Sequence, residues 1–505
     1  MHEDDSRSRR ALQRLDRRTV LASLGGGVAA LAGCSSRSPA ANQSDTPTAT
    51  PAETATDLAP LQVTPEEGVV GDEVTVAGQG LPSNATLELA WERVEGRWAI
   101  AKHSEIVGPQ YTTSSEAVAE VQTDGDGTFS TTITVPEDYG GDHTIHARRD
   151  GSALARGTFT VRPSFELDRT SAPLGERFTV TGHGIGWGTY RRNDQVIWDN
   201  GFTGLFTAVT NRGTARAKVT AAGPPGTHVL EIGGGYGGIS YLNPQQSPYP
   251  RDFRYASWTV EVTDPEDPVR QWRRPSGSES PVTGFYPDLD RQQGSLSVTP
   301  TSGSVGSTAI VSGQGLPADE SVRLQWLTMT GSRVSGNGYS STAKDLLTVE
   351  TDGQGRFETD FEVPDDLGGT HPIVATVGEK SVAAAGFVVR PSVVSFGPTE
   401  GPEGTPIDVH LKGVGWTAYD NTYTYVYNND YVGYACGFNT NGDVQVQLRA
   451  AGEPGLHTIT LYPALYKKPN EDRETNMYMK PQLTYLDDHP VRPLPSFQFL
   501  FRMTE

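Results

Sequence analysis

The sequence predicts an all-β protein, and three observations lead to that prediction. Short runs of alternating apolar and polar residues are separated by Gly, Pro, Asn and Asp, and no long stretch shows helical periodicity. Glycine and proline are abundant, with 57 and 35 residues among 505. One stretch occurs twice: LQVTPEEGVVGDEVTVAGQGLPSNATLELAW begins at Leu61, and LSVTPTSGSVGSTAIVSGQGLPADESVRLQW begins at Leu296. A chain of this length is expected to contain roughly three or four domains.

The repetition continues beyond these two stretches. FTVRPS begins at Phe159 and returns as FVVRPS at Phe387. Each copy contains two modules joined by little more than Arg-Pro-Ser, which predicts a stiff pair and a duplicated unit in the order A1-B1-A2-B2. The predicted boundaries are 60–163 for A1, 164–263 for B1, 294–391 for A2 and 392–505 for B2. Residues 264–293, between B1 and A2, predict a linker or an ordered strap.

Alternating residues predict the cores of the A modules. One predicted strand carries Trp91 on the same face as two leucines, and Trp326 repeats this arrangement in A2. A second predicted strand near Phe129 presents another apolar face, and two such faces packed together form a β-sandwich. Turn signals recur about every 8–12 residues, which is typical of an immunoglobulin-like sandwich. We therefore predict four immunoglobulin-like modules, with both tryptophans in the core rather than at a binding site.

The turn motifs of the A modules resemble those of a known family. In A1 they are VTVAGQGLP from Val74, TDGDGTF from Thr123 and a Val135-Pro136 pair; A2 repeats GQGLP from Gly313 and TDGQGRF from Thr351. This pattern resembles the immunoglobulin-like modules of IPT/TIG type found in bacterial and archaeal surface proteins. The resemblance implies a fold and a surface setting, and extends more weakly to the start of each B module. It implies no particular ligand, because such modules serve adhesion, spacing and sugar binding alike.

The first 33 residues predict export and anchoring. Arg17 and Arg18 precede a short apolar run and resemble a twin-arginine signal, which implies export in the folded state. LAGC, ending at Cys34, resembles a lipobox, which implies cleavage before this cysteine and a lipid on its thiol. The alternative is an ordinary signal peptide with an incidental cysteine. Residues 34–59 are rich in Ser, Thr, Ala and Pro and predict a flexible tether. The expected location is the extracytoplasmic face of the membrane.

Charge and cysteine content narrow the class of partner. The net charge is −20, and such a surface repels phosphate backbones, so we expect no nucleic-acid partner. The excess of acid with few lysines resembles proteins of salt-loving archaea; a GC-rich genome that favours arginine codons is the alternative. Cys34 and Cys436 are the two cysteines, and because the first lies in the leader region we expect no intramolecular disulfide in the mature chain.

Several motifs could carry chemistry, and each has a structural alternative. The turn at Asp124 resembles part of a calcium loop, but Gln354 replaces one acid in the A2 copy, which favours a hairpin turn. Four histidines recur in register and predict half-buried, hydrogen-bonded residues at strand starts rather than zinc ligands: they are His143, His371, His228 and His457. No catalytic order of residues recurs in both halves. The sequence therefore predicts no catalytic residue, no metal and no cofactor.

Tyrosines mark the candidate ligand contacts. Tyr423, Tyr425 and Tyr427 alternate on one strand, and core packing is favoured over a sugar-binding face. The B modules also contain long loops, at about 233–254 and 463–495, and long loops on a rigid sandwich are common binding sites. The candidate contacts in them are Tyr236, Tyr241, Tyr249, Tyr466, Tyr478 and Tyr485, although ordinary loop packing is favoured over ligand contact.

These observations predict a non-catalytic cell-surface lipoprotein. Its partners would be the membrane, through the lipid on Cys34, and a cell-surface glycan or an envelope protein. The alternative is an enzyme that acts on polysaccharide with its site in the long B loops, where carboxylates would converge within about 5–10 Å. A spacer without any ligand is the third hypothesis.

Overall fold

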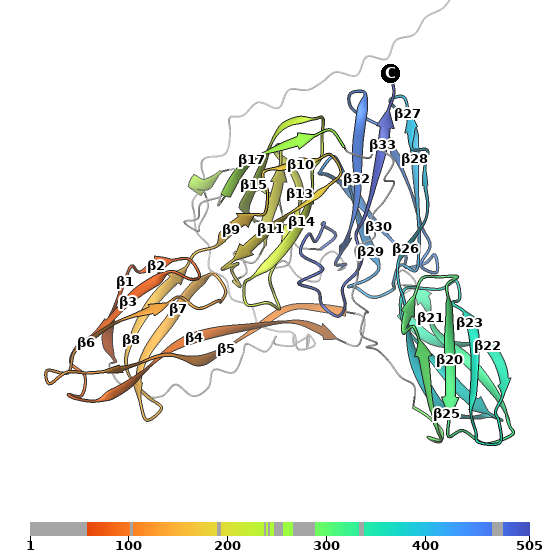
Figure 1. The fold of residues 1–505 in the computed structure, drawn as a ribbon, viewed down its shortest axis with the longest axis horizontal. Helices are drawn as coiled ribbons and strands as arrows, with labels where there is room; N and C mark the ends of the chain where they lie inside the picture. The colour runs from red at the N-terminus through yellow and green to blue at the C-terminus, as the bar shows by residue number, and fades with distance from the viewer. Residues whose placement is uncertain are drawn as a thin grey trace, which may run out of the picture. The chain divides into compact units, whose positions relative to one another are not determined.

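The computed structural model describes residues 58–101, 105–188, 193–236, 239–240, 243–246, 256–265, 288–332, 338–466 and 478–505. These ranges belong to one compact unit and consist of strands and turns, with one short 3-10 helix at Pro244–Gln246. None of the helical structure in them is long and apolar enough to cross a membrane. The predicted all-β sandwich class is confirmed (Figure 1).

The A1 strands form an eight-stranded sheet in the order β5-β4-β7-β8-β1-β3-β6, with β2 paired to β8. The sheet folds over a core that contains Leu87, Leu89, Trp91 and Phe159. β4 and β5 continue past this core as a long hairpin (Figure 1). The bounds are β1 (Ala59–Thr64), β2 (Glu67–Gly68), β3 (Glu73–Gly78), β4 (Thr86–Ala101), β5 (Glu105–Gln122), β6 (Phe129–Thr134), β7 (Gly141–Arg149) and β8 (Ser152–Val161).

A2 repeats the strand pairing of A1 except for the parallel pair β1–β8, which joins the two A1 sheets into one. Its two sheets have the orders β18-β20-β23 and β19-β25-β24-β21-β22, and Trp326 is buried between them. The burial of Trp91 and Trp326 confirms the predicted core. The bounds are β18 (Ser295–Thr299), β19 (Ser302–Gly303), β20 (Thr308–Gln314), β21 (Ser321–Ser332), β22 (Gly338–Glu350), β23 (Phe357–Glu362), β24 (Gly369–Val377) and β25 (Lys380–Val389).

B1 consists of a three-stranded sheet, β14-β11-β9, and a larger sheet in the order β10-β17-β15-β12-β13 with β16 paired to β15. Its core contains Phe178, Trp198 and Phe206. The bounds are β9 (Ser164–Leu167), β10 (Ser171–Pro173), β11 (Arg177–His183), β12 (Asp194–Trp198), β13 (Gly201–Phe206), β14 (Ala215–Thr220), β15 (Gly226–Tyr236), β16 (Ile239–Ser240) and β17 (Ala256–Thr263).

B2 has the same two sheets, in the orders β31-β28-β26 and β27-β33-β32-β29-β30. Tyr423 and Tyr425 are buried in its core, so the packing role predicted for them is confirmed. The bounds are β26 (Ser392–Gly397), β27 (Glu400–Gly401), β28 (Pro406–Lys412), β29 (Thr422–Tyr427), β30 (Asp430–Cys436), β31 (Val444–Arg449), β32 (Gly455–Ala464) and β33 (Phe497–Met503). The two halves thus share one pattern of strand pairing, although the module boundaries themselves stay predictions.

Glycines allow each A module to approach the B module that follows it. Gly140 forms an isolated β-bridge with Gly186, and Gly368 forms the equivalent bridge with Gly415. A Cβ atom on Gly140 or on Gly368 would lie 2.0 Å from a carbonyl oxygen of the following B module. Side chains at these positions would therefore force the two backbones apart, which explains why the same glycine motifs recur in both copies.

The turns at Asp124 and Asp352 use their carboxylates internally. Asp124 Oδ1 accepts hydrogen bonds from the Asp126 and Thr128 amides at 3.0 and 2.8 Å, and Asp352 accepts the equivalent pair in A2. The pKa of each carboxyl is lowered, mainly by one backbone hydrogen bond. The donor is the Thr128 amide for Asp124 and the Arg356 amide for Asp352. These bonds are those of a tight turn closed by an aspartate side chain, as the sequence predicts. The predicted hairpin is wrong, because β5 does not pair with β6, nor β22 with β23; each turn joins strands that pair with other partners.

This geometry predicts a pH dependence. Since each carboxyl has a lower pKa in the folded chain, its contribution to stability is complete above its unfolded pKa of about 3.9 and is lost as the pH falls through the folded value. The variant Asp352→Asn keeps one turn acceptor but removes the titration. We expect urea unfolding of this variant to depend less on pH below about 4 than that of the wild type. Asp126→Asn is the matched control, because that exposed side chain lies in the A1 turn without capping it; an equal flattening by both variants would contradict the assignment.

Candidate functional site

The structure describes some of the residues that the sequence nominates for function. Cys34, Arg17, Arg18, Tyr241 and Tyr249 lie outside the described ranges. Tyr236 ends β15, where its backbone pairs with Ile239 of β16. The remaining three loop tyrosines belong to B2 and are described with their side chains.

The B2 tyrosines contribute to packing between modules. Tyr478 and Tyr485 are buried in a cluster that also contains Trp98 from the A1 hairpin and Leu205 from B1. The Tyr485 hydroxyl donates a hydrogen bond to the Tyr419 carbonyl. Tyr466 is half-buried, and its ring meets Phe438 edge-on at 4.7 Å. In the described residues these three tyrosines do not form a common exposed patch, and their role as ligand contacts stays a hypothesis.

Asp488, on the long B2 loop, fixes that loop to two other modules. Its Oδ2 atom accepts hydrogen bonds from the Thr207 hydroxyl and the Val209 amide, both at 2.8 Å, and Oδ1 accepts the Thr210 amide at 3.1 Å. Trp98 of the A1 hairpin donates its indole N–H to the same carboxylate at 3.1 Å. Burial raises the pKa of Asp488, while these donors act in the opposite direction. The carboxylate is therefore a structural acceptor shared by A1, B1 and B2.

Further contacts continue this B1–B2 interface. The Leu205 amide donates to the Pro481 carbonyl at 2.8 Å, and the Leu483 amide donates back to Leu205 at 3.0 Å. Asn429 donates to the Thr220 carbonyl at 2.7 Å. Four B2 side chains complete the B1 core: Val426, Tyr462, Leu483 and Leu500. The two B modules thus share one apolar core, which stabilises them as a pair.

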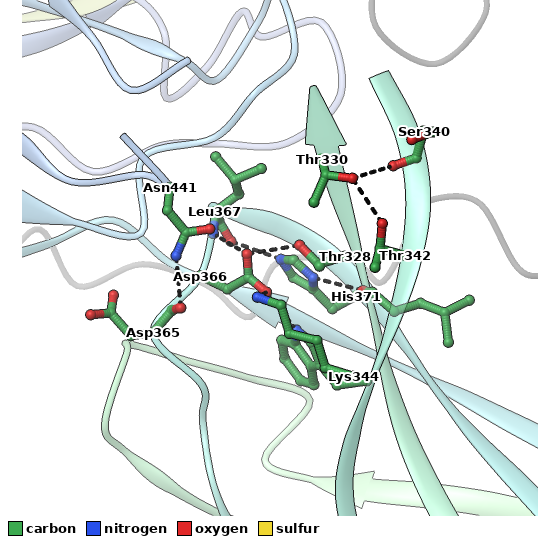
Figure 2. Close-up of polar contacts among 12 residues, drawn as sticks. Thr328, Thr330, Ser340, Thr342, Lys344, Asp365, Asp366, Leu367, His371 and Asn441 are labelled. Carbon is green, nitrogen blue, oxygen red and sulfur yellow. Dashed lines mark hydrogen bonds and ion pairs between the residues drawn. The ribbon is translucent and has the colours of Figure 1, made fainter. Parts of the chain in front are cut away.

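A polar cluster lies inside A2 around Asp366. Its carboxylate accepts hydrogen bonds from Trp326 Nε1 at 3.1 Å and the Thr328 hydroxyl at 2.7 Å, and the Lys344 ammonium lies 3.3 Å away. Figure 2 shows Asp366 directed toward Thr328 and Lys344, while the Asp365 carboxylate points away from it. Because each oxygen has structural donors, this buried carboxylate stabilises the sandwich.

The recurring histidines occupy the positions predicted for them. His371 stacks on Trp326 with ring centroids 4.6 Å apart, and its two nitrogens lie 2.9 and 2.7 Å from the Leu327 and Leu367 carbonyls. His143 repeats this arrangement on Trp91. Burial lowers the pKa of His371, so its ring is neutral at neutral pH and can donate to only one carbonyl at a time. The predicted hydrogen bonding is confirmed for both rings, which are fully buried rather than half-buried as predicted.

The B-module histidines have the same position but different partners. His228 Nδ1 lies 2.6 Å from a carboxylate oxygen of Asp199, whereas His457 Nδ1 accepts a hydrogen bond from the Asn428 amide at 2.8 Å. Both rings are nearly buried and each stacks on an aromatic ring. Among the residues that the structure describes, no group of three or more His, Cys, Asp and Glu side chains is placed to hold a metal ion.

A small cavity and a larger one lie between A2 and B2. The small one has a volume of about 60 Å³ and is lined by His371, Asp420 and Arg492, the last two forming a buried ion pair. That volume holds about two waters and excludes a sugar. The larger cavity has a volume of about 350 Å³, within the usual range of about 300–1,000 Å³ for small-molecule sites. It is the candidate functional site.

Residues from both modules line the larger cavity. A2 contributes the serines of β19 and the following turn together with Arg390, which follows β25. B2 contributes Leu486 and Arg492 from its long loop and Phe497 from the start of β33. The site could not be recognised in the sequence because its two walls lie far apart in the chain.

Comparisons with known proteins identify no family. No family model matches the sequence, and no curated protein matches it. Among solved structures, the chain is similar to invasin, a bacterial integrin-binding protein, at 11% identity over 88% of this chain and 78% of that chain, with a TM-score of 0.18. The ICAM-5 D1–D4 ectodomain matches at 14% identity over 81% of this chain and 95% of that chain, with a TM-score of 0.17.

Salmonella alpha-2-macroglobulin is a third similar structure. The identity is 10%, the match covers 88% of this chain, and the TM-score is 0.17. The chain spans only 31% of the length of that protein. Likenesses at this level carry no argument about function, which has to rest on the residues themselves.

Proposed function

We propose that this protein is a non-catalytic cell-surface lipoprotein that presents rigid immunoglobulin-like sandwiches for binding to a glycan or an envelope protein. One observation carries the non-catalytic part: residues 478–495 of the long B2 loop, where an enzyme would need its cleft, pack against other modules. Tyr485 is buried, and Asp488 accepts hydrogen bonds from A1 and B1. A carboxylate held in this way by structural donors is unsuited to proton transfer with a substrate.

The leader sequence supports the surface location. Arg17 and Arg18 followed by an apolar run match a twin-arginine export signal, and Cys34 follows the lipobox-like LAG. A single lipid chain gives only weak and reversible binding, so stable anchoring requires more than one acyl chain or a second contact with the membrane.

Membrane partition of the full-length chain tests this proposal. We expect the wild type expressed in its native host to enter the detergent phase of a phase-separation assay. Cys34→Ser should move the protein to the aqueous phase or the medium, because the thiol that carries the lipid is absent. Cys436→Ser is the matched control, since that cysteine lies within β30 and its replacement should leave the partition unchanged. Equal partition of wild type and Cys34→Ser would overturn the lipid anchor.

The enzyme alternative requires a separate assay. We expect the mature chain to release no reducing ends from a panel of acidic and neutral polysaccharides, while retaining one or more of them in a pull-down. Release of reducing ends that survives repurification would favour the enzyme over the binding protein.

A further inference from the structure

The duplication places two arginines in equivalent positions with different surroundings. Arg162 follows β8 and donates its backbone N–H to the Gly68 carbonyl at 2.7 Å; Arg390 follows β25 and donates to the Gly303 carbonyl at the same distance. In A1, the Arg162 guanidinium forms a two-pronged ion pair with Glu67, with Nε donating to Oε2 at 2.8 Å. The arginine of A1 is therefore neutralised by its own module.

In A2 the carboxylate partner is missing. Ser302 occupies the position of Glu67, since both pair in parallel with the strand that precedes the arginine. The neighbouring turn also loses a carboxylate, because Asp72 of A1 corresponds to Ser307 of A2. The Ser307 hydroxyl donates to the Ser304 carbonyl at 2.7 Å. The A2 position thus carries two fewer negative charges than its A1 counterpart.

Arg390 consequently keeps hydrogen-bonding capacity. Its Nε atom is buried and has no hydrogen-bond partner in the described parts of the chain. Because protein atoms cover Nε, a ligand would bind through the other N–H groups of the guanidinium, for which no ion-pair partner is found in the described parts of the chain. The guanidinium presents its N–H groups in a planar fork that fits a carboxylate better than any other common anion except phosphate.

The cavity of about 350 Å³ lies at this arginine. Ser302, Ser304 and Ser307 supply small polar groups on one wall, and Leu486 with Phe497 supplies apolar surface. Arg492 also borders the cavity, but its charge is balanced by Asp420. The site therefore carries a net positive charge within a chain whose net charge is −20, and this charge favours an anion over a neutral ligand.

We propose that this cavity binds a carboxylate-bearing sugar, such as a uronic acid residue of an acidic polysaccharide. Arg390 holds the carboxylate, the serines hydrogen-bond to sugar hydroxyls, and the apolar wall packs against the C–H face of the ring. The proposal deepens the binding function proposed above and rests on it for the choice of a sugar; the presence of an anion site follows from the residues alone.

Titration calorimetry of the mature chain with galacturonate and with galactose tests this proposal. The two sugars differ in the carboxylate, so we expect galacturonate to bind at least about tenfold more tightly, equivalent to one good charged contact of about 1.4 kcal/mol. Ser302→Glu should reduce galacturonate binding by the same factor or more, because it restores the internal carboxylate of A1. Arg390→Gln should have a similar effect without adding volume. Arg162→Gln is the matched control and should leave binding unchanged.

The outcomes separate this inference from the proposed function. Equal binding of galacturonate and galactose would overturn the site, and so would binding that is insensitive to both Ser302→Glu and Arg390→Gln. Neither result would affect the proposed lipid anchor, which the membrane-partition assay tests separately. Binding of a peptide with a free terminal carboxylate, lost in Ser302→Glu, together with no binding of galacturonate, would overturn the sugar and assign the pocket to a protein ligand.

Discussion

Asp488→Ala is expected to cost about 3–5 kcal/mol of stability and to release the long B2 loop. The substitution removes the common acceptor of five donor groups, and each buried donor left unpaired costs about 1–3 kcal/mol. These donors are the Trp98 indole, the Thr207 hydroxyl, the Val209 amide, and the amide and hydroxyl of Thr210. Since they come from A1 and B1, the loss should fall on the contacts between modules rather than within one sandwich.

Two measurements would detect this loss of stability. Urea unfolding monitored by tryptophan fluorescence should show an earlier transition, and limited proteolysis should cut between residues 478 and 495. Asp487→Ala is the matched control. The Asp487 carboxylate is exposed and accepts a hydrogen bond from the Arg216 amide at 3.1 Å, so its removal should cost about 1 kcal/mol of stability or less. If the two variants lose equal stability, Asp488 does not have the role assigned to it.

Asp366→Ala is expected to destabilise A2 by a similar amount, about 3–5 kcal/mol. The carboxylate accepts the Trp326 indole, the Thr328 hydroxyl and the Leu367 amide, all in a buried position. Without it, the Lys344 ammonium also loses its ion-pair partner. The effect should be confined to one sandwich, so that the first unfolding transition reports A2.

Asp365→Ala provides the comparison for this variant. Asp365 precedes Asp366 directly, but its side chain is exposed and forms an ion pair with Lys412 across the joint with B2. Exposed ion pairs contribute about 0–1 kcal/mol. A calorimetric scan should therefore show a clear shift for Asp366→Ala and a small one for Asp365→Ala; the reverse order would refute the role of the buried acid.

The fold was predictable because alternation and duplication are local properties of the sequence. Trp91 and Trp326 fall on apolar faces that repeat in both copies, and the structure buries them. The buried acids were missed, although a signal existed: VPEDYGG and VPDDLGG contain Asp138 and Asp366 in register. An acid that recurs beside a glycine pair in an otherwise variable turn indicates a structural acceptor.

The packing of the B2 loop could not be predicted from the sequence. Tyr478 and Tyr485 are as consistent with an exposed binding loop as with an interface, because the pattern does not reveal which surface lies opposite. Asp487 and Asp488 are adjacent and chemically identical, yet only the second is buried. The cavity at Arg390 depends in the same way on two distant segments, although the exchange of Glu67 for Ser302 was visible in the aligned copies.

A designed disulfide tests the central claim, that the long B2 loop locks B1 and B2 into one rigid pair. The Thr207 and Thr484 hydroxyls lie 3.1 Å apart, so the two side chains face each other across the B1–B2 interface and cysteines placed there would bring their sulfur atoms together. In the Cys436→Ser background, Thr207→Cys with Thr484→Cys should form a cross-link under mild oxidation, detected as one linked peptide by mass spectrometry. If both thiols instead stay free and react with maleimide in the folded protein, the two modules are not joined in this way.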